Sequence, residues 1–262
     1  MKHPRLKKWS RRAFIGAGTV AGGGFLLGVA GFTFAPSRFS LVSADAADKG
    51  QLTTWITITP DNVITILIPH CEMGQGTPTA LAMMAAEELE ADWSLVRVQE
   101  APALDAYANG YIVRAGGNYV PAVMGRGVDY GAYKLAEWFG FQVTGGSTAV
   151  RSTGEYGMRV AGAAAKEMLL AAAAKQWSVN VSDCLAKGSR ITHAGSGRSA
   201  TFGELARSAA AQPVPTSPAL KNPESFTIRR TSATRLDIPS KVDGSAKYAI
   251  DFITPGLLYA AI

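Results

Sequence analysis

Residues 72–77 combine two glycines, a glutamine and a threonine in a pattern suited to holding an anionic ligand. They read Glu-Met-Gly-Gln-Gly-Thr and lie between an apolar, β-branched run at 63–68 and a run at 77–90 rich in Ala, Leu, Met and Glu. The first run predicts a strand and the second a helix. Gly74 and Gly76 allow positive φ angles and a close approach of the backbone to a ligand.

The start of the predicted helix supplies hydrogen-bond donors. We expect Thr77 to cap the helix and Pro78 to lie in its first turn. The N–H groups of a first turn have no carbonyl partner within the helix, and the helix dipole favours negative charge there. The pattern therefore predicts either a site for a phosphorylated cofactor or a strand–turn–helix junction without a ligand, because glycine spacing alone is not specific.

A second glycine-rich turn repeats the arrangement further along the chain. Residues 144–148 read Thr-Gly-Gly-Ser-Thr and precede a helix-forming run that ends near Trp177. Glycines again permit close approach, while hydroxyls and N–H groups lie at a helix start. Two such turns indicate either two contacts with one extended anionic cofactor or two ordinary helix starts.

Several separated segments, in this order, together resemble the molybdopterin-binding subunit of the xanthine dehydrogenase/aldehyde oxidase family. The branch to which the chain is similar contains periplasmic isoquinoline 1-oxidoreductase β subunits and membrane-associated aldehyde dehydrogenase large subunits. The resemblance covers roughly residues 50 to 262. The segments that carry it are 72–77, 85–93, 96–102, 144–148 and 237–248.

The resemblance implies an α+β fold and a division of the chain. A molybdopterin-binding domain segment, made of hairpins plus helices, is expected at 47–212. A Pro-rich linker follows at 213–236, and residues 237–262 would be the first strands of an α/β hammerhead domain.

The family's chemistry is the oxidation of aldehydes or the hydroxylation of N-heterocycles, with water as the oxygen source. The resemblance implies a molybdenum–molybdopterin cofactor, in the cytosine dinucleotide form, whose metal is held by the pterin rather than by protein side chains. It also implies a partner subunit that carries [2Fe–2S] clusters and a membrane cytochrome c subunit as electron acceptor.

The family's site residues transfer to two segments of this chain. Gln75 matches a glutamine whose amide contacts the cofactor, and Gly74 and Gly76, followed by Thr77, let the backbone close on it. Phosphate oxygens would be bound by the second turn. Its matching residues are Gly145, Gly146, Ser147 and Thr148.

No catalytic residue is assigned. The family's catalytic glutamate lies in a Gly-x-Gly-Glu-like motif near the C-terminus of a complete subunit, and we find no such motif in this sequence. We interpret Glu155, which follows Gly154 in another context, as an ordinary helical acid, and Glu72, Glu87 and Glu88 likewise. His70 either touches the cofactor or is a satisfied strand-end histidine.

The N-terminal residues have the pattern of an export signal. Ser10, Arg11 and Arg12 precede an uncharged stretch at 13–37, which is typical of twin-arginine signals. Seven glycines between Gly16 and Gly31 make the stretch only mildly hydrophobic. We expect residues 1–46 to be a signal read by the twin-arginine translocation machinery, either cleaved near 44–46 or retained as an anchor, which predicts a periplasmic protein associated with the inner membrane.

Charge argues against a nucleic-acid partner. Residues 1–43 hold seven of the 26 Lys and Arg residues and none of the 20 Asp and Glu residues, so the rest of the chain is close to neutral. The sequence pI of about 9.4 is therefore a property of the signal segment.

Cysteine usage excludes a metal cluster in this chain. Cys71 and Cys184 are the two cysteines, and neither has metal-ligand spacing. An oxidising compartment would permit a disulfide between them, and the sequence leaves that state open. We interpret Cys71 as a small buried residue at a strand end.

The remaining sequence patterns predict further local structure. We expect a hairpin from strands at 53–59 and 63–68, a strand at 96–100, and a small hairpin beginning at 190–194. Thr201 and Glu204 have capping-box spacing for a helix to about Ala211. A helix at 132–139 has aromatics that either line a substrate route or pack in the core. Residues 212–223 form an extended strap or linker, and 241–251 and 256–262 should be strands.

Two other function classes fit parts of the sequence. The chain ends on an apolar run, so we expect a fragment of a larger subunit that is inactive by itself, because a strand without its partners exposes an apolar edge. A non-catalytic exported binding or scaffold protein that reuses the fold is the alternative. A Rossmann-type domain is disfavoured because no G-x-G-x-x-G follows a first strand.

Overall fold

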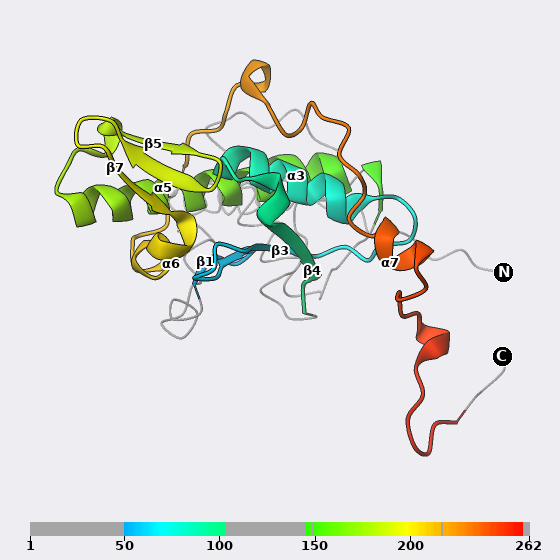
Figure 1. The fold of residues 1–262 in the computed structure, drawn as a ribbon. Helices are drawn as coiled ribbons and strands as arrows, with labels where there is room; N and C mark the ends of the chain where they lie inside the picture. Colours follow the sequence, from blue (N-terminus) through cyan, green and yellow to red (C-terminus); the bar gives the residue numbers. More distant parts are fainter. Residues whose placement is uncertain (1–49, 103–144, 148, 216, 259–262) are drawn as a thin grey trace, which may run out of the picture.

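The structure, a computed structural model, describes residues 50–102, 145–147, 149–215 and 217–258 (Figure 1). Within these ranges it contains two β-sheets and a set of helices, which confirms the predicted α+β class. Our predictions of an export signal at 1–46 and a helix at 132–139 fall outside the described residues, as does Thr148.

The main sheet has four strands in the order β1-β2-β3-β4. The first three are antiparallel, whereas β4 pairs parallel to β3. The β2–β3 pair is the predicted hairpin, and Ile56 lies opposite Ile66 in it. The bounds are β1 Gln51–Thr53, β2 Ile56–Ile58, β3 Ile64–Ile68 and β4 Val96–Glu100.

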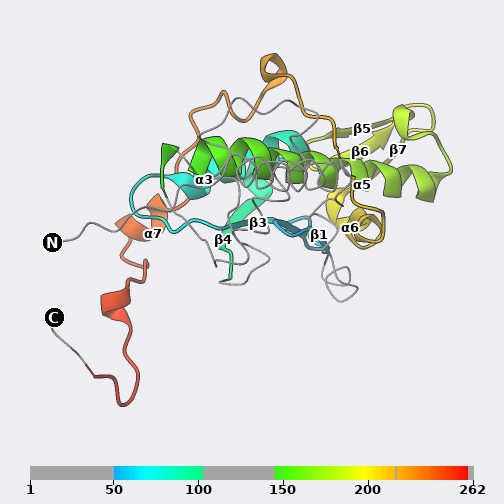
Figure 2. The same cartoon turned by 180° about the vertical axis from the view of Figure 1, so that it is seen from behind.

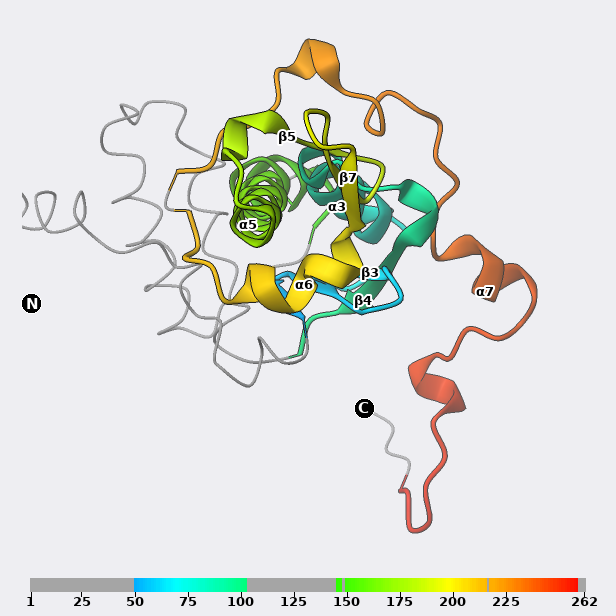
Figure 3. The same ribbon diagram turned by 60° about the vertical axis from the view of Figure 1, so that its left-hand side comes forward.

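Two long helices cover one face of this sheet. Helix α3, Thr77–Leu89, connects the parallel strands β3 and β4, and α5 is Arg159–Trp177. Figure 3 looks nearly along α5 and shows α3 beside it, with the strands below both helices. Buried isoleucines of the sheet and leucines of the two helices form one continuous core. Because α3 is packed on nearly all sides, most of its residues are buried, including the two acids near its C-terminus.

The two helices approach closely because small residues face one another. A Cβ atom added at Gly162 of α5 would lie 2.2 Å from the carbonyl oxygen of Ala85 in α3. No side chain fits at that distance without moving a backbone. Glycine at 162 therefore fixes the spacing of the helix pair.

A π-helical segment, η5 Ala149–Met158, leads into α5. It follows the second glycine-rich turn, so the predicted helix-forming run starts with a wider coil before the α-helix begins. The other short turns are the 3-10 helices η2 Trp93–Leu95, η6 Val181–Asp183, η7 Pro223–Ser225 and η8 Ala249–Asp251.

A small antiparallel sheet and helix α6 pack against α5 toward its C-terminal end (Figure 2). The sheet has the order β5-β6-β7, so the predicted hairpin gains a third strand. Helix α6, Phe202–Ala210, begins with the predicted capping box: Thr201 accepts from the Glu204 backbone, and the Glu204 carboxylate accepts from that of Thr201. The strands are β5 Cys184–Lys187, β6 Arg190–His193 and β7 Arg198–Thr201.

Residues 212–215 and 217–237 form an extended strap, as predicted for its first half. In Figure 1 the strap leaves α6, passes over the helices and descends to α7 beside the loop that precedes α3. Helix α7 is Ile238–Val242.

The strands predicted at 241–251 and 256–262 are wrong for the described residues to 258. That segment holds the end of α7 and η8, and Val242, Ile250 and Leu258 are exposed. The apolar pattern is real, but no neighbouring strand in the described part of the chain supplies the hydrogen bonds a strand requires. Among the helices that the structure describes, none is both long and apolar enough to cross a membrane.

The close helix pair generates a stability prediction. Gly162→Ala should lower the free energy of unfolding by about 2 kcal/mol, because overpacking forces the two backbones apart. Gly145→Ala is the matched control, since nothing in the described part of the chain lies within 4 Å of the added Cβ. Urea unfolding measures both; equal stability of the two variants would contradict the close approach.

Candidate functional site

The first glycine turn, residues 71–76, has a backbone that requires its glycines. Gly74 has φ of 101° and Gly76 has φ of 74°, values that side-chain-bearing residues rarely adopt. Gly76 is the residue that precedes the first turn of α3, in a left-handed conformation. The turn thus ends by presenting the N-terminus of α3, as the sequence predicted.

Two side chains brace this turn from within. The Glu72 carboxylate oxygen Oε1 accepts the backbone N–H of Gly74 at 2.6 Å and that of Gly76 at 3.2 Å. The amide of Gln75 accepts from the N–H of Met73 at 2.6 Å and donates to the carbonyl of Cys71 at 2.8 Å. The turn is therefore preorganised by its own residues.

Thr77 does not cap the helix, contrary to our prediction. The capping position is Gly76, without a side-chain hydrogen bond, and Thr77 is the first helical residue, fully buried. Pro78 lies in the first turn as predicted. The chain reaches the helix through a left-handed glycine, and this geometry leaves the Thr77 hydroxyl inside the first turn.

Two buried polar atoms of this region have no hydrogen-bond partner among the described residues. They are the Thr77 hydroxyl Oγ1 and the second Glu72 carboxylate oxygen, Oε2. Buried polar groups are nearly always hydrogen-bonded. The hydroxyl can donate to a polar ligand, and the carboxylate oxygen can accept from one.

The second glycine turn, described at residues 145–147, lies against the first. A Cβ atom added at Gly146 would lie 3.5 Å from the Cβ of Gln75, while no described residue lies within 4 Å of a Cβ added at Gly145. Ser147 is exposed, and the Gly146 carbonyl accepts the N–H of Val150 at 3.1 Å. The fold thus brings together two turns that are distant in sequence; their contact with a cofactor stays a prediction.

A third segment joins the two turns, and sequence reasoning missed its central residue. Arg235 donates to the Gly74 carbonyl at 3.0 Å and to Glu72 Oε1 at 3.0 Å. Its other side faces Asp237, which it contacts at 3.0 and 2.7 Å, and Lys241 also pairs with Asp237. The hydrogen bonds from Arg235, with those from Lys241, hold the pKa of the Asp237 carboxyl well below its usual range despite some desolvation. A sequence signal for Arg235 was available, because the segment 237–248, which carries part of the family resemblance, begins two residues after it.

His70 lies at the end of β3 and is almost fully buried. Its Nε2 atom is 2.9 Å from the Thr153 hydroxyl in η5, which links the first glycine turn to the segment behind the second. This contact satisfies one ring nitrogen, and both alternatives for His70, a satisfied strand-end histidine and a contact with the cofactor, stay predictions.

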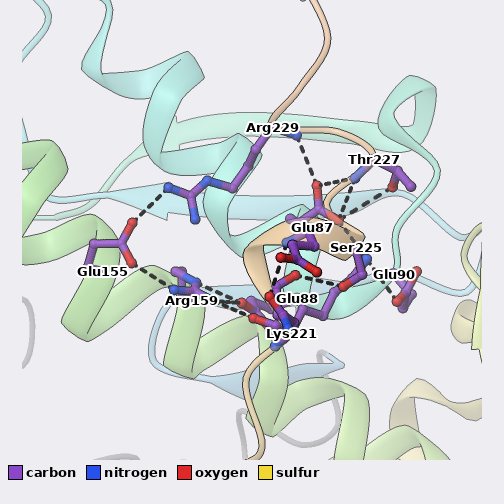
Figure 4. A network of polar contacts seen from close by, with 11 residues as sticks. Glu87, Glu88, Glu90, Glu155, Arg159, Lys221, Ser225, Thr227 and Arg229 are labelled. Atoms are coloured by element: carbon purple, nitrogen blue, oxygen red, sulfur yellow. Dashed lines mark hydrogen bonds and ion pairs between the residues drawn. The ribbon is translucent and has the colours of Figure 1, made fainter.

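A buried charge network fastens the strap to α3 (Figure 4). Glu87 is fully buried, and its carboxylate accepts from Lys221 Nζ at 2.6 Å. It also accepts three successive backbone N–H groups of the strap, from Thr227 at 3.0 Å, Ile228 at 2.7 Å and Arg229 at 2.9 Å. Burial alone would raise the pKa of Glu87, but these hydrogen bonds together lower it.

Glu88 anchors the strap from the next position. It accepts from Arg159 Nε at 2.7 Å and from the backbone N–H of Lys221 at 2.7 Å. Arg159 also pairs with Glu155 at 2.8 Å, and Arg229 of the strap pairs with the same carboxylate at 2.7 Å. Burial would raise the pKa of Glu155, but the two arginines lower it.

These contacts refine our interpretation of four glutamates. Glu87 and Glu88 are helical, but they are buried structural acids and not solvent-facing ones. Glu155 lies in the π-helical segment, and Glu72 lies in the turn before α3, where its carboxylate accepts two backbone N–H groups.

The two cysteines are not joined to one another. Cys71 and Cys184 do not form a disulfide, and Cys71 is exposed, so its predicted burial is wrong. Within the described ranges, no group of three or more His, Cys, Asp and Glu side chains is arranged to hold a metal ion.

The residues present fit a phosphorylated organic cofactor. Its oxygens would meet a helix N-terminus, two glycines that permit close approach and a buried hydroxyl. The charges of Glu72 and Asp237 balance those of Arg235 and Lys241, and Glu72 already accepts the N–H groups of Gly74 and Gly76. Affinity for an anion would therefore come from the first turn of α3 and its dipole rather than from net positive charge.

Comparison with known proteins identifies relatives. The family model described as a molybdopterin cofactor-binding domain matches residues 7–137, which is half of the chain. Isoquinoline 1-oxidoreductase subunit beta of Brevundimonas diminuta is 31% identical over 303 positions, covering 99% of this chain and 34% of the relative. Membrane-bound aldehyde dehydrogenase [pyrroloquinoline-quinone] of Gluconacetobacter polyoxogenes is 33% identical over 260 positions, covering 95% of this chain and 28% of the relative. The chain spans about a third of the length of these curated relatives.

The Glu87 network predicts a loss of stability in acid. Because its pKa is lowered in the folded protein, the stabilisation is complete above the ordinary pKa of 4.5 and is lost as pH falls through the lower value. Glu87→Gln should cost about 3 kcal/mol near neutral pH, since it breaks a buried pair. Its unfolding free energy should then vary less with pH in acid.

Urea unfolding between about pH 3 and pH 7 measures this difference. Glu100→Gln, at an exposed position on β4, is the control and should behave as the unmodified protein. An unchanged pH profile in Glu87→Gln would contradict the role of the network.

Proposed function

Because the chain belongs to the molybdopterin cofactor-binding domain family of the xanthine dehydrogenase type, we propose that it forms the N-terminal part of the cofactor-binding subunit of an exported molybdenum hydroxylase. The proposed substrates are aldehydes or N-heterocycles, in keeping with the names of the two relatives, and water is the oxygen source. Residues 1–262 alone should show no turnover, because no catalytic glutamate was assigned in them.

The observation that supports this proposal best is the meeting of two glycine turns at the N-terminus of α3. Gly146 of the second turn lies against Gln75 of the first, and the buried Thr77 hydroxyl lies in the helix turn that follows. A ligand that contacts both turns meets hydrogen-bond donors at a helix start and must carry hydrogen-bond acceptors. A pterin with a phosphate-linked nucleotide carries them.

Each turn has a defined task in this proposal. Gly74 and Gly76 let the backbone approach the cofactor, the Gln75 amide contacts it, and the Thr77 hydroxyl donates to one of its oxygens. The second turn holds phosphate oxygens; its residues are Gly145, Gly146, Ser147 and Thr148. The chemistry that the bound group supplies is the oxidation of a carbon centre with oxygen from water.

The partners follow from the same assignment. Electrons from the substrate must leave the subunit, for which we propose a small subunit with [2Fe–2S] clusters and a membrane cytochrome c subunit. The cytosine dinucleotide form of the cofactor is proposed from the resemblance to the bacterial branch.

Gln75→Ala should lower the cofactor content of the complete protein several-fold, because it removes an amide contact and two braces of the turn, each worth about 1 kcal/mol. Molybdenum and pterin in the purified protein are the quantities to measure. Gln99→Ala is the matched control, since Gln99 is exposed on β4 and should leave the content unchanged.

The other outcomes separate the alternatives. Equal molybdenum content in Gln75→Ala and in the unmodified protein would contradict the role of Gln75. Since the name of one relative includes pyrroloquinoline quinone, the same samples should be analysed for a quinone. A complete protein that holds neither group would favour the non-catalytic exported binding or scaffold protein.

Export is tested separately from cofactor binding. We propose that the twin-arginine translocation machinery carries the protein to the periplasm, where it associates with the inner membrane. Replacing Arg11 and Arg12 by lysine should leave the protein in the cytoplasm, because the machinery recognises the arginine pair. Immunoblots of cell fractions measure this, and periplasmic protein in the double variant would contradict it.

A further inference from the structure

The strap follows α3 toward the first glycine turn and is held along the way. Near the C-terminal end of α3 it is bound by Glu87 and Glu88 (Figure 4). Toward the N-terminal end, the N–H of Leu236 donates to the Thr79 hydroxyl at 2.9 Å. In Figures 1 and 2 its last residues lie beside the loop that precedes α3. The strap therefore connects the buried network to the candidate site.

Arg235, near the end of the strap, makes two hydrogen bonds to the turn and lies next to Gly76. Its guanidinium donates to the Gly74 carbonyl and to the Glu72 carboxylate, both at 3.0 Å. Its Cζ would lie 3.7 Å from a Cβ added at Gly76. Glu72 is the same carboxylate that accepts the N–H groups of Gly74 and Gly76. Arg235 thus holds the Glu72 carboxylate, and that carboxylate holds the backbone of the turn.

The guanidinium is itself held in position from behind. Asp237 accepts from its Nε at 3.0 Å and from a terminal nitrogen at 2.7 Å, a two-point contact that sets the plane of the guanidinium. Lys241 pairs with Asp237 in turn. Because the side chain is 34% exposed, removing it creates no core cavity.

We propose that Arg235 is a positioning residue of the cofactor site, which couples docking of the strap to the ligand-binding conformation of the first glycine turn. It holds Glu72 and the Gly74 carbonyl, so that the turn keeps the positive φ angles of Gly74 and Gly76 and presents the first turn of α3 to a phosphate-bearing ligand. Docking of the strap and binding of the cofactor then stabilise one another by the same factor. This inference rests on the proposed function of the site.

The test uses the complete protein with its cofactor bound. In Arg235→Ala the cofactor should dissociate about 10-fold faster, the effect of losing one charge-assisted contact set of roughly 1.4 kcal/mol. The dissociation rate in Arg235→Lys should lie between those of the unmodified protein and Arg235→Ala, because an ammonium keeps the charge but lacks the planar arrangement of donors in a guanidinium. Arg198→Ala is the control: Arg198 also donates to a carbonyl, that of Trp177 at 2.8 Å, but from the small sheet.

A second readout separates positioning from a merely structural role. Protease cleavage within residues 217–237 should be slowed by bound cofactor in the unmodified protein, because a docked strap and a bound cofactor stabilise one another. In Arg235→Ala the cofactor should no longer slow it. A residue that only stabilises the fold would raise cleavage equally with and without cofactor.

Each outcome decides a different claim. Cofactor retention and cofactor-dependent protection that are unchanged in Arg235→Ala would overturn the inference and leave the proposed function intact. An unmodified complete protein that holds no phosphorylated cofactor would overturn the proposed function, and the inference with it.

Discussion

The enclosure of α3 is the constraint on which the rest of the structure depends. The sheet, α5 and the strap together bury this helix, and Glu87 and Glu88 are buried with it. A carboxylate is not stable in such a place without partners. The strap supplies them through Lys221 and through three successive N–H groups, so its path over α3 is set by the need to satisfy two charges. That path delivers Arg235 to the opposite end of the helix, where the glycine turn lies.

The candidate site is thereby an assembly of three segments at one end of one helix. The first turn comes from the β3–α3 connection, the second precedes η5, and the strap contributes Arg235. Their charges balance, and the turn is braced by Glu72 and Gln75 before any ligand arrives. A site of this kind recognises its ligand through oriented N–H groups and close backbone approach, which suits the phosphate-linked part of a large cofactor.

Local sequence patterns were sufficient for much of the fold. The β2–β3 hairpin, α3, β4 and the capping box of α6 all follow from short-range periodicity and turn chemistry, and the structure has them. The predicted strands beyond residue 241 failed because strand formation depends on partners that local apolarity does not specify. Thr77 was misassigned as a cap because the left-handed Gly76 takes that position.

The site was predictable in its glycines and not in its long-range contacts. Gly74 and Gly76 have the positive φ values that their spacing indicated. Nothing local connects Arg235 to Glu72, or Glu87 to the strap, because these pairs form only after the chain has folded back on itself. One signal was available: a helix that is apolar nearly all round is a buried helix, so its acids require partners.

The central claim is that both glycine turns bind one cofactor, and amide hydrogen exchange tests it most directly. The complete protein would be compared with and without its cofactor, and exchange followed at residues 74–79 and 145–150. Our account predicts that both segments exchange more slowly together when the cofactor is bound, while amides of the small sheet β5-β6-β7 are unaffected. Protection of only one segment, or of neither, would contradict it.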